Sequence, residues 1–416
     1  MIKRFLLILI LPLILISCKS KENPLITETP AQIEAVSATP KPTSTPTPIP
    51  PTPTPTASPT STKTATPTPT ATLSFLESYP KEGYGPTDFP PNINPLTGLL
   101  VDDPAVLDRR PISIKVSNYQ RGIRPQWGLS LADHVFEFYH EGGLTRFNAI
   151  FYSNDVEQVG PIRSARFSDK DIVEMYDAFF AYASGDARVR SRLAYSNFTD
   201  RMATISDAPC PPTIQYPLCR IEQETWNHLV TNTTILYQHF EDKGVSNGRQ
   251  NLDGLLFNTT LPAEGQPANS VIVRYSYGSY HKWLYDAASG KYIRYEDMID
   301  ADPDNERYQP MTDRLTGEQV SAANVIVLLA PHRYYSYTPE MIEIPFDGYG
   351  KAYLFRDGQV YLINWARLAN QDLLSLTFDD GSRFPLKPGN VWFDVVGATS
   401  QVVQESPDWR FQFLIP

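Results

Sequence analysis

The chain has 416 residues, of which 41% are hydrophobic and 20% are charged. This composition excludes a wholly disordered protein and leaves room for about two folded domains beside an unfolded segment. The formal charge of −10 and the isoelectric point of about 5.2 argue against a general nucleic-acid binder, because such proteins carry a basic surface. Proline is the outlier, with 38 Pro against 22 Gly, and its excess predicts an extended linker.

The N-terminus has the pattern of a secretory signal. A short basic start precedes the apolar run from Phe5 to Ile16, which is about 12 residues long, whereas a transmembrane helix needs about 20. The run ends in Leu-Ile-Ser-Cys, where a small residue precedes Cys18, as at the processing site of bacterial lipoproteins. We therefore expect a signal peptide over residues 1–17, lipidation of Cys18, and an extracytoplasmic protein that is lipid-anchored to the bacterial cell membrane. The alternative is an ordinary signal peptide that happens to contain a cysteine.

Residues 18–75 are dominated by Pro, Thr, Ser and Ala. Such a segment cannot offset the entropy of ordering by burying apolar surface, so we expect a disordered Pro/Thr-rich linker. With a rise of about 3.1 Å per residue in polyproline II conformation, a fully extended linker would hold a folded head roughly 100 Å or more from the membrane. The density of threonine also permits O-glycosylation.

Two cysteines remain besides Cys18. Cys210 and Cys219 flank a proline-rich segment, and we expect both outside the reducing cytosol. The sequence therefore predicts a disulfide that closes this loop. Because the loop is short, its entropic contribution to stability is about 2 to 3 kcal/mol at most. No cysteine is then left as a catalytic thiol.

The folded head is expected to begin with an α/β domain over residues 76–260. Alternating apolar residues indicate strands at residues 110–117, 132–139 and 147–152. Residues 168–180 have helical spacing, with acidic side chains near the start, where the helix dipole favours negative charge. A further strand is expected at residues 180–183. Strands that alternate with helices in this way are typical of α/β domains.

The second domain, over residues 261–416, is expected to be mainly β. Short β-branched or aromatic runs indicate strands at residues 271–277, 282–285, 292–295, 324–330, 352–355, 360–364, 374–378 and 391–396. Asp357-Gly358 and Asp380-Gly381 are typical hairpin turns, since Gly adopts positive φ at little cost and Asp tolerates it. The head as a whole is therefore predicted to be α+β.

Several short motifs resemble the YerB-like family of bacterial lipoproteins. They are EGGLTRF from Glu141, VGPIRSAR from Val159, RPQ from Arg124, GLS from Gly128, AD from Ala132, NVIV from Asn324, EI from Glu343, GYG from Gly348, DG from Asp357, and Trp365. Together they span about residues 92–400, in the order that the family shows. The resemblance implies paired N- and C-terminal domains of unknown function on a lipoprotein stem. Family members often carry His-Asn-Leu near the end of the first domain, whereas this chain has Asn227-His228-Leu229, which leaves His228 without a role implied by the family.

The densest chemical cluster combines Arg146, Arg163 and Arg166 with Glu141 and Glu137. A guanidinium group presents a rigid fork of donors that matches a carboxylate or a phosphate, and neighbouring glycines let backbone N–H groups approach an anion. The cluster therefore indicates a binding site for a phosphate-bearing or carboxylate-bearing ligand, such as an anionic cell-wall polymer. The alternative is an internal network of Arg–Glu pairs that ties the adjacent turn to the strands.

A cell-envelope hydrolase is the main alternative to a binding protein. Glu137, Glu141 and Asp186 would supply an acid and a base for cleavage of a glycan or wall polymer if two carboxyl groups lay about 5 to 10 Å apart. The head contains neither a Gly-x-Ser-x-Gly elbow nor a Ser-x-x-Lys motif, so serine-nucleophile hydrolysis has no support. A structural or partner-binding head is the second alternative. The sequence leaves open whether the protein is an enzyme and what its oligomeric state is.

No cofactor and no metal site is predicted. His134 and His140 share strand parity with Phe136 and Phe138, which favours a core or groove position over metal binding. The acidic run from Asp300 starts like a calcium loop but lacks the glycine and the final glutamate that such loops need. The expected partners are the membrane, through the lipid anchor, and the anionic wall polymer, with no nucleic acid.

Overall fold

The structure, a computed structural model, describes residues 75–221, 228–298 and 305–415. The expected signal peptide, Cys18, the linker through residue 74 and most of the acidic run after Asp300 lie outside these residues. None of the helices in the described ranges is long and apolar enough to cross a membrane. Strands dominate this part of the chain, in which 24 strands and three α-helices lie wholly within the described ranges.

The helices are short. The α-helices are α2 (Phe167–Met175), α3 (Ala187–Ala194) and α4 (Thr233–Asp242). Single 3-10 turns span Pro104–Leu107, Arg121–Ile123, Leu129–Leu131 and Thr199–Arg201.

The larger of two main sheets has 11 strands in the order β20-β19-β18-β15-β22-β2-β3-β1-β4-β5, with β9 beside β19. From the first half of the chain come β1 (Ile112–Ser117), β2 (His134–Tyr139), β3 (Thr145–Phe151), β4 (Phe179–Ala181) and β5 (Met202–Ala203). From the second half come β9 (Gln266–Pro267), β15 (Asn324–Ala330), β18 (Gly348–Arg356), β19 (Gln359–Arg367), β20 (Ser375–Thr377) and β22 (Val391–Gly397). The halves join where β2 pairs in parallel with β22, His134 lying opposite Val391.

The smaller sheet has seven strands in the order β13-β12-β11-β10-β24-β23, with β14 beside β12. Its strands are β10 (Ser270–Ser276), β11 (Ser279–Asp286), β12 (Lys291–Asp297), β13 (Tyr308–Pro310), β14 (Ser321–Ala322), β23 (Gln401–Glu405) and β24 (Asp408–Gln412). Three two-stranded pairs complete the set: β16 (Arg333–Tyr337) with β17 (Glu340–Glu343), β8 (Leu256–Phe257) with β21 (Pro385–Leu386), and β6 (Leu218–Arg220) with β7 (Leu229–Thr231).

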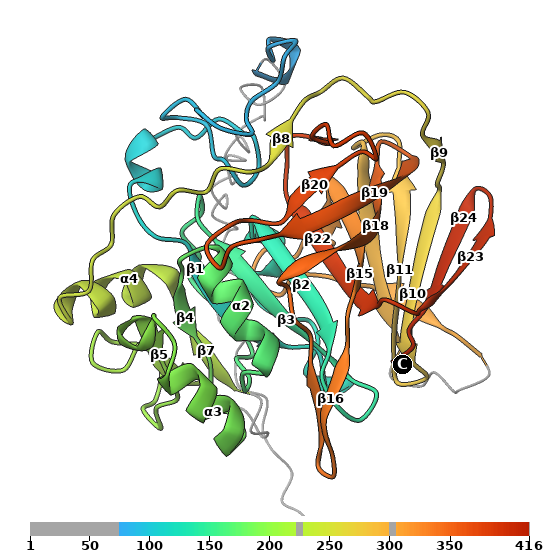
Figure 1. The fold of residues 1–416 in the computed structure, drawn as a ribbon. Helices are drawn as coiled ribbons and strands as arrows, with labels where there is room; N and C mark the ends of the chain where they lie inside the picture. The colour runs from blue at the N-terminus through green and yellow to red at the C-terminus, as the bar shows by residue number, and fades with distance from the viewer. Residues whose placement is uncertain (1–74, 222–227, 299–304, 416) are drawn as a thin grey trace, which may run out of the picture. The chain divides into compact units, whose positions relative to one another are not determined.

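The larger sheet is covered on both faces. On one face, Trp283 of β11 donates to Asp394 of β22, and the ring of Phe411 on β24 packs against Tyr353 of β18. On the other face, α2 packs against β2 (Figure 1), and Tyr176, which follows α2 directly, contacts Phe136. Because both faces are covered, β1, β2 and β22 are buried at every position, as is typical of central strands.

The strands expected from the sequence form close to their predicted bounds, and the head is strand-rich as expected. The helix expected at residues 168–180 forms as α2 but ends at Met175. Asp177 has φ 46°, in the left-handed region that ends a helix, and β4 begins at Phe179. The Asp357-Gly358 turn joins β18 to β19 with φ of 51° and 73° at its two central residues.

The boundary expected between residues 260 and 261 stays a prediction, as does a separate α/β first domain. The described residues all fall in one compact unit, and the larger sheet takes strands from both sides of that boundary.

Candidate anion-binding site

The arginine cluster lies on the face of the larger sheet that α2 covers. Arg146 of β3 is opposite Phe138 of β2, and Lys115 of β1 is opposite Asn148 of β3. Arg163 follows in the segment before α2, where its N–H donates to the carbonyl of Lys115 over 2.9 Å. Arg166 immediately precedes α2, so the segment between β3 and the helix brings Arg163 and Arg166 to the face on which Arg146 of β3 lies.

A buried ion pair underlies the cluster. Lys115 Nζ lies 2.9 Å from Asp169 Oδ1, and both side chains are fully buried. Asp169 also accepts hydrogen bonds from Asn148 Nδ2 over 2.8 Å and from the N–H of Arg166 over 2.6 Å. Burial lowers the pKa of Lys115 to about 7, with further lowering by Arg146 and Arg166, although Asp169 opposes the shift.

Arg166 has an internal partner. Its guanidinium forms two hydrogen bonds to the carboxylate of Glu141, and His140 Nδ1 lies 2.8 Å from Glu141 Oε2. Burial favours a neutral Glu141, but His140 and Arg166 outweigh it and lower the pKa of this carboxyl strongly. The pKa of His140 is lowered well below its usual value by burial and then by Arg146, which keeps the ring neutral at pH 7. The predicted Arg–Glu network therefore exists for this pair.

Arg146 differs from Arg166. Its Nη1 donates to the carbonyl of Ser164 over 2.6 Å, and no carboxylate in the described part of the chain forms an ion pair with it. Burial lowers the pKa of Arg146 to about 9, and Arg166 and Arg163 add to that shift, whereas Glu141 and Asp169 oppose it. The pKa of Arg163 is likewise lowered by burial and by Arg166. The cluster thus places positive charges close together without a carboxylate for Arg146.

A pocket of about 480 Å³ opens beside the cluster. It is lined by Glu141, Gly142, Ser164, Arg166, Phe167, Asp186, Val189, Pro339, Glu340, Met341 and Ile342. The last four come from the β16–β17 hairpin, which extends beyond the larger sheet (Figure 1). The hairpin is held by Tyr335, whose ring lies 4.8 Å from that of Phe167, and by Glu343, which pairs with Arg192 over 2.5 Å. Both halves of the chain therefore build this pocket.

Glu137 does not join the arginines. It alternates with Phe136 and Phe138 along β2, and so it points to the opposite face, toward the smaller sheet. There it accepts hydrogen bonds from Arg294, Asn118 and Thr145. Its side chain is buried together with that of Arg294. Of the predicted site residues, the structure brings together Arg146, Arg163, Arg166 and Glu141.

Glu137, His281 and Asp394 are arranged so that one atom from each lies within 4.8 Å of the others. Three such groups have the composition of a metal site. Arg294, however, pairs with Glu137 and lies 3.7 Å from Asp394. Its guanidinium supplies the positive charge that a metal ion would bring, so this cluster does not fit a metal.

The three carboxylates proposed for hydrolysis do not lie at one site. With Glu137 on the far face, only Glu141 and Asp186 share the pocket. The pKa of Asp186 is lowered to about 2, first by its hydrogen bond from Arg188, and the pKa of Glu141 is also low. A general acid for glycan cleavage needs a raised pKa, and neither carboxyl has one. Neither carboxyl is therefore suited to act as the general acid.

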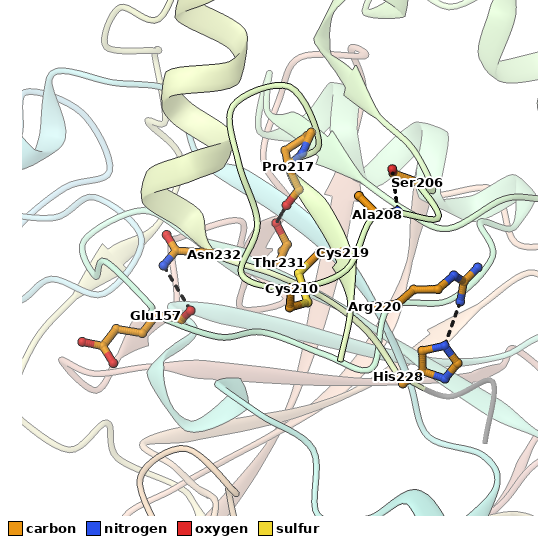
Figure 2. The surroundings of a disulfide bond; sticks show 10 residues. All are labelled: Glu157, Ser206, Ala208, Cys210, Pro217, Cys219, Arg220, His228, Thr231 and Asn232. Atoms are coloured by element: carbon orange, nitrogen blue, oxygen red, sulfur yellow. Dashed lines mark hydrogen bonds between the residues drawn. A yellow bond between two sulfur atoms is a disulfide. The ribbon is translucent and has the colours of Figure 1, made fainter. Parts of the chain in front are cut away.

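Cys210 and Cys219 are joined by a disulfide (Figure 2). The bond closes the loop before β6, and Thr231 of β7 fastens the same loop by donating to the carbonyl of Pro217 over 2.8 Å. His228 lies beside Arg220, with 3.3 Å between Nε2 and Nη1, and not at the pocket. Its neighbours indicate a local structural role, consistent with the altered order of the motif.

Sequence reasoning missed Lys115, Asp169 and Glu340. Lys115 stood in an alternating strand, where a lysine ordinarily faces solvent, and only the helix packed above β1 makes it a buried charge. Glu340 lies about 200 residues from the cluster in the chain, so no local pattern connects the two.

The described part of the chain is a strand-rich protein of two main sheets and short helices, with a pocket that is built from both halves and lined in part by Arg166. Family models described as "Protein of unknown function (DUF3048)" match residues 96–246 as the N-terminal domain and residues 271–393 as the C-terminal domain. The chain belongs to this family. The predicted two-domain arrangement fits the order of the two matches.

A curated relative and a solved structure support the same family assignment. The chain is 30% identical over 316 residues to "Putative lipoprotein YerB" of Bacillus subtilis (strain 168), which covers 73% of this chain and 85% of the relative. It is also similar to the crystal structure of the YerB protein from Bacillus subtilis, with a TM-score of 0.60, 26% sequence identity, and coverage of 73% of this chain and 96% of that one. The resemblance found in the sequence motifs is confirmed.

Proposed function

We propose that this protein is a membrane-anchored, extracytoplasmic lipoprotein whose head binds an anionic ligand of the cell envelope. The anchor is supported by the processing motif before Cys18 and by the name of the Bacillus subtilis relative. A Cys18→Ala variant is expected to lose fatty-acid labelling and to leave the membrane fraction. Continued labelling of that variant would overturn the anchor.

The observation that carries the binding function is the environment of Arg146. This cation is partly buried, has Arg163 and Arg166 as electrostatic neighbours, and has no ion pair to a carboxylate in the described residues. Glu141 and Asp169 attract this cation without forming an ion pair with it, so its burial still costs free energy, which a bound anion would offset. The same anion would reverse the electrostatic lowering of the pKa values of Lys115, Arg146 and Arg163.

The proposal is tested by binding of inorganic phosphate and sulfate to the mature chain, made from residue 18 with Cys18→Ser. Both anions are expected to raise the melting temperature by mass action. Arg146→Gln should abolish this rise, because a charge-assisted hydrogen bond contributes about 1.5 to 3 kcal/mol. Arg333→Gln, an equal change of charge at an exposed position of β16, is the control and should keep the rise.

Glu141→Gln separates a ligand site from an internal network. Glu141 competes with any external anion for the guanidinium of Arg166, so its neutralisation should tighten phosphate binding about tenfold. A purely internal network predicts a lower melting temperature for this variant and no response to anions in either protein. That result would contradict the binding function.

A further inference from the structure

The pocket beside the arginine cluster combines an apolar wall with carboxylates. Its lining carboxylates are Glu141, Asp186 and Glu340. Among the described residues that line it, Arg166 is the only arginine. We propose that this pocket binds a primary alkylammonium ion, with an aliphatic body against the apolar wall and the ammonium group on Glu340. The inference goes beyond the anion-binding function, since Arg146 and Arg163 are not among the lining residues.

The arginines at the pocket already have carboxylate partners. The pairs are Arg166 with Glu141, Arg188 with Asp186, and Arg192 with Glu343. The pKa of Glu141 is strongly lowered and that of Asp186 is lowered to about 2, so both carboxyls are ionised at pH 7 and keep these pairs. An external anion therefore finds no unpaired partner among these three arginines.

Glu340 is the lining carboxylate outside these pairs. It accepts hydrogen bonds from Tyr139 Oη over 2.8 Å and from the N–H of Gly142 over 2.7 Å, and both donors are neutral. No cation in the described ranges forms an ion pair with it. A carboxylate offers about four acceptor positions, so about half of them remain for a ligand. The two donors orient the carboxylate, and a bound cation would neutralise its charge.

The apolar wall selects an aliphatic body for that cation. Phe167 comes from α2, Val189 from α3, and Met341 and Ile342 from β17. Each is at most 7% exposed, and the first three belong to one apolar cluster, so packing holds the wall in place. A small inorganic cation would leave this wall in water, whereas methylenes would cover it.

The size of the pocket suits such a ligand. Its volume of about 480 Å³ lies within the usual range of about 300 to 1,000 Å³ for small-molecule sites. A primary ammonium group carries three N–H donors, which match the open acceptor positions of Glu340. The side chain of lysine has this combination of methylenes and ammonium, so free or peptide-bound lysine belongs to the ligand class.

The experiment compares hexylammonium, ethylammonium, 1-hexanol and hexanoate by NMR titration of the mature chain with Cys18→Ser, observed at the methyl groups of Val189, Met341 and Ile342. Hexylammonium should bind about tenfold more tightly than ethylammonium, because its additional methylenes cover the apolar wall. It should bind about tenfold more tightly than hexanol, because only the cation meets the charge of Glu340. Hexanoate should perturb these methyl groups least.

Glu340→Gln is the decisive variant. It should remove the advantage of hexylammonium over hexanol while leaving hexanol binding within about twofold, since glutamine keeps an acceptor for Tyr139. Asp347→Asn makes the same change of charge at an exposed position that lines the neighbouring pocket and not this one. It is the matched control and should keep the advantage of hexylammonium.

The outcomes are distinct from those of the anion-binding test. The alkylammonium assignment is overturned if hexylammonium binds no more tightly than hexanol, if its advantage survives in Glu340→Gln, or if hexanoate binds at these methyl groups as tightly. Phosphate and Arg146→Gln test the other site, so a protein that responds to phosphate but not to hexylammonium would retain the anion-binding function and lose this assignment.

Discussion

Lys115 is the residue on which the electrostatics of the cluster converge. Its ammonium is fully buried between Asp169 and the ring of Phe138, 3.7 Å from the ring centroid. Burial lowers its pKa from 10.5 to about 7 in the folded protein. In the unfolded chain the lysine regains its ordinary pKa, so folding and protonation are linked.

The linkage between folding and the protonation of Lys115 predicts how the free energy of unfolding depends on pH. Between pH 7 and about 10 the unfolded chain binds more protons at this site, so the free energy of unfolding should rise with pH, by up to about 1.4 kcal/mol per unit. The contribution is fully present above about pH 10.5 and is lost as the pH falls through about 7. Urea unfolding of the wild type across this range measures the slope.

Lys115→Met provides the comparison for that measurement. The variant should be less stable overall, because it removes the partner of buried Asp169, but its slope between pH 7 and 10 should be much flatter. Equal slopes in the two proteins would show that another group titrates. Phosphate should reduce the wild-type slope, since a bound anion raises the pKa of Lys115.

For single residues, the sequence predicted that the three arginines lie together, but it did not predict that Glu137 faces the opposite side of the sheet. Glu137 and Arg146 lie on adjacent strands, and they face the same side only in one of two registers. The register observed pairs Glu137 with Phe147, which sends Arg146 to the other face. Strand periodicity alone does not predict which of the two registers forms.

Local sequence patterns predicted where strands and turns form, but they did not predict which strands pair with each other. The strands at residues 324–330 and 391–396 form nearly as expected, because β-branched and aromatic runs between turn signals depend on short-range preferences. Their parallel pairing with each other and with β2 joins distant segments and has no local signature. The β16–β17 hairpin was also missed, although it supplies a wall of the candidate site.

The disulfide between Cys210 and Cys219 is expected to order the loop that it closes more than it stabilises the whole fold. Cys210→Ser with Cys219→Ser should lower the free energy of unfolding by no more than about 3 kcal/mol, since the chain-entropy contribution of a short loop is small. Limited proteolysis should nevertheless cut residues 211–217 faster in this variant. Fragment masses locate the cleavage.

Thr231→Val is the control for the loop. It removes the hydrogen bond to Pro217 but leaves the disulfide in place, so its loop should become protease-sensitive only after reduction. Proteolysis of the double serine variant at the wild-type rate would show that strand pairing, and not the disulfide, orders the loop.

For the whole molecule, the two family-matched segments are expected to depend on each other. Arg294 of the second segment neutralises Glu137 of the first, and truncation of such a buried pair costs about 3 to 5 kcal/mol. The pairing of β2 with β22 would also leave an open strand edge on each side if the segments were separated. We expect residues 76–260 and 261–416 to be insoluble or unfolded when expressed alone and to associate when co-expressed.

Cleavage of the folded chain between the two segments tests their mutual dependence more directly. A protease site inserted after Glu264, which is exposed and lies between the two family matches, allows cleavage after folding. The two pieces should co-elute in size-exclusion chromatography and separate only in denaturant. Separation under native conditions would mean that the segments are independent domains.

The junction between β2 and β22 also sets an order of events during biosynthesis. His134 pairs with Val391, about 250 residues later, so there is an interval in which β2 is available and its partner strand is not. Throughout that interval the edge of β2 is an unpaired, apolar template, and Glu137 lacks Arg294. The head therefore completes its central sheet only once almost the entire chain is available, so a truncated product would remain open to aggregation and proteolysis.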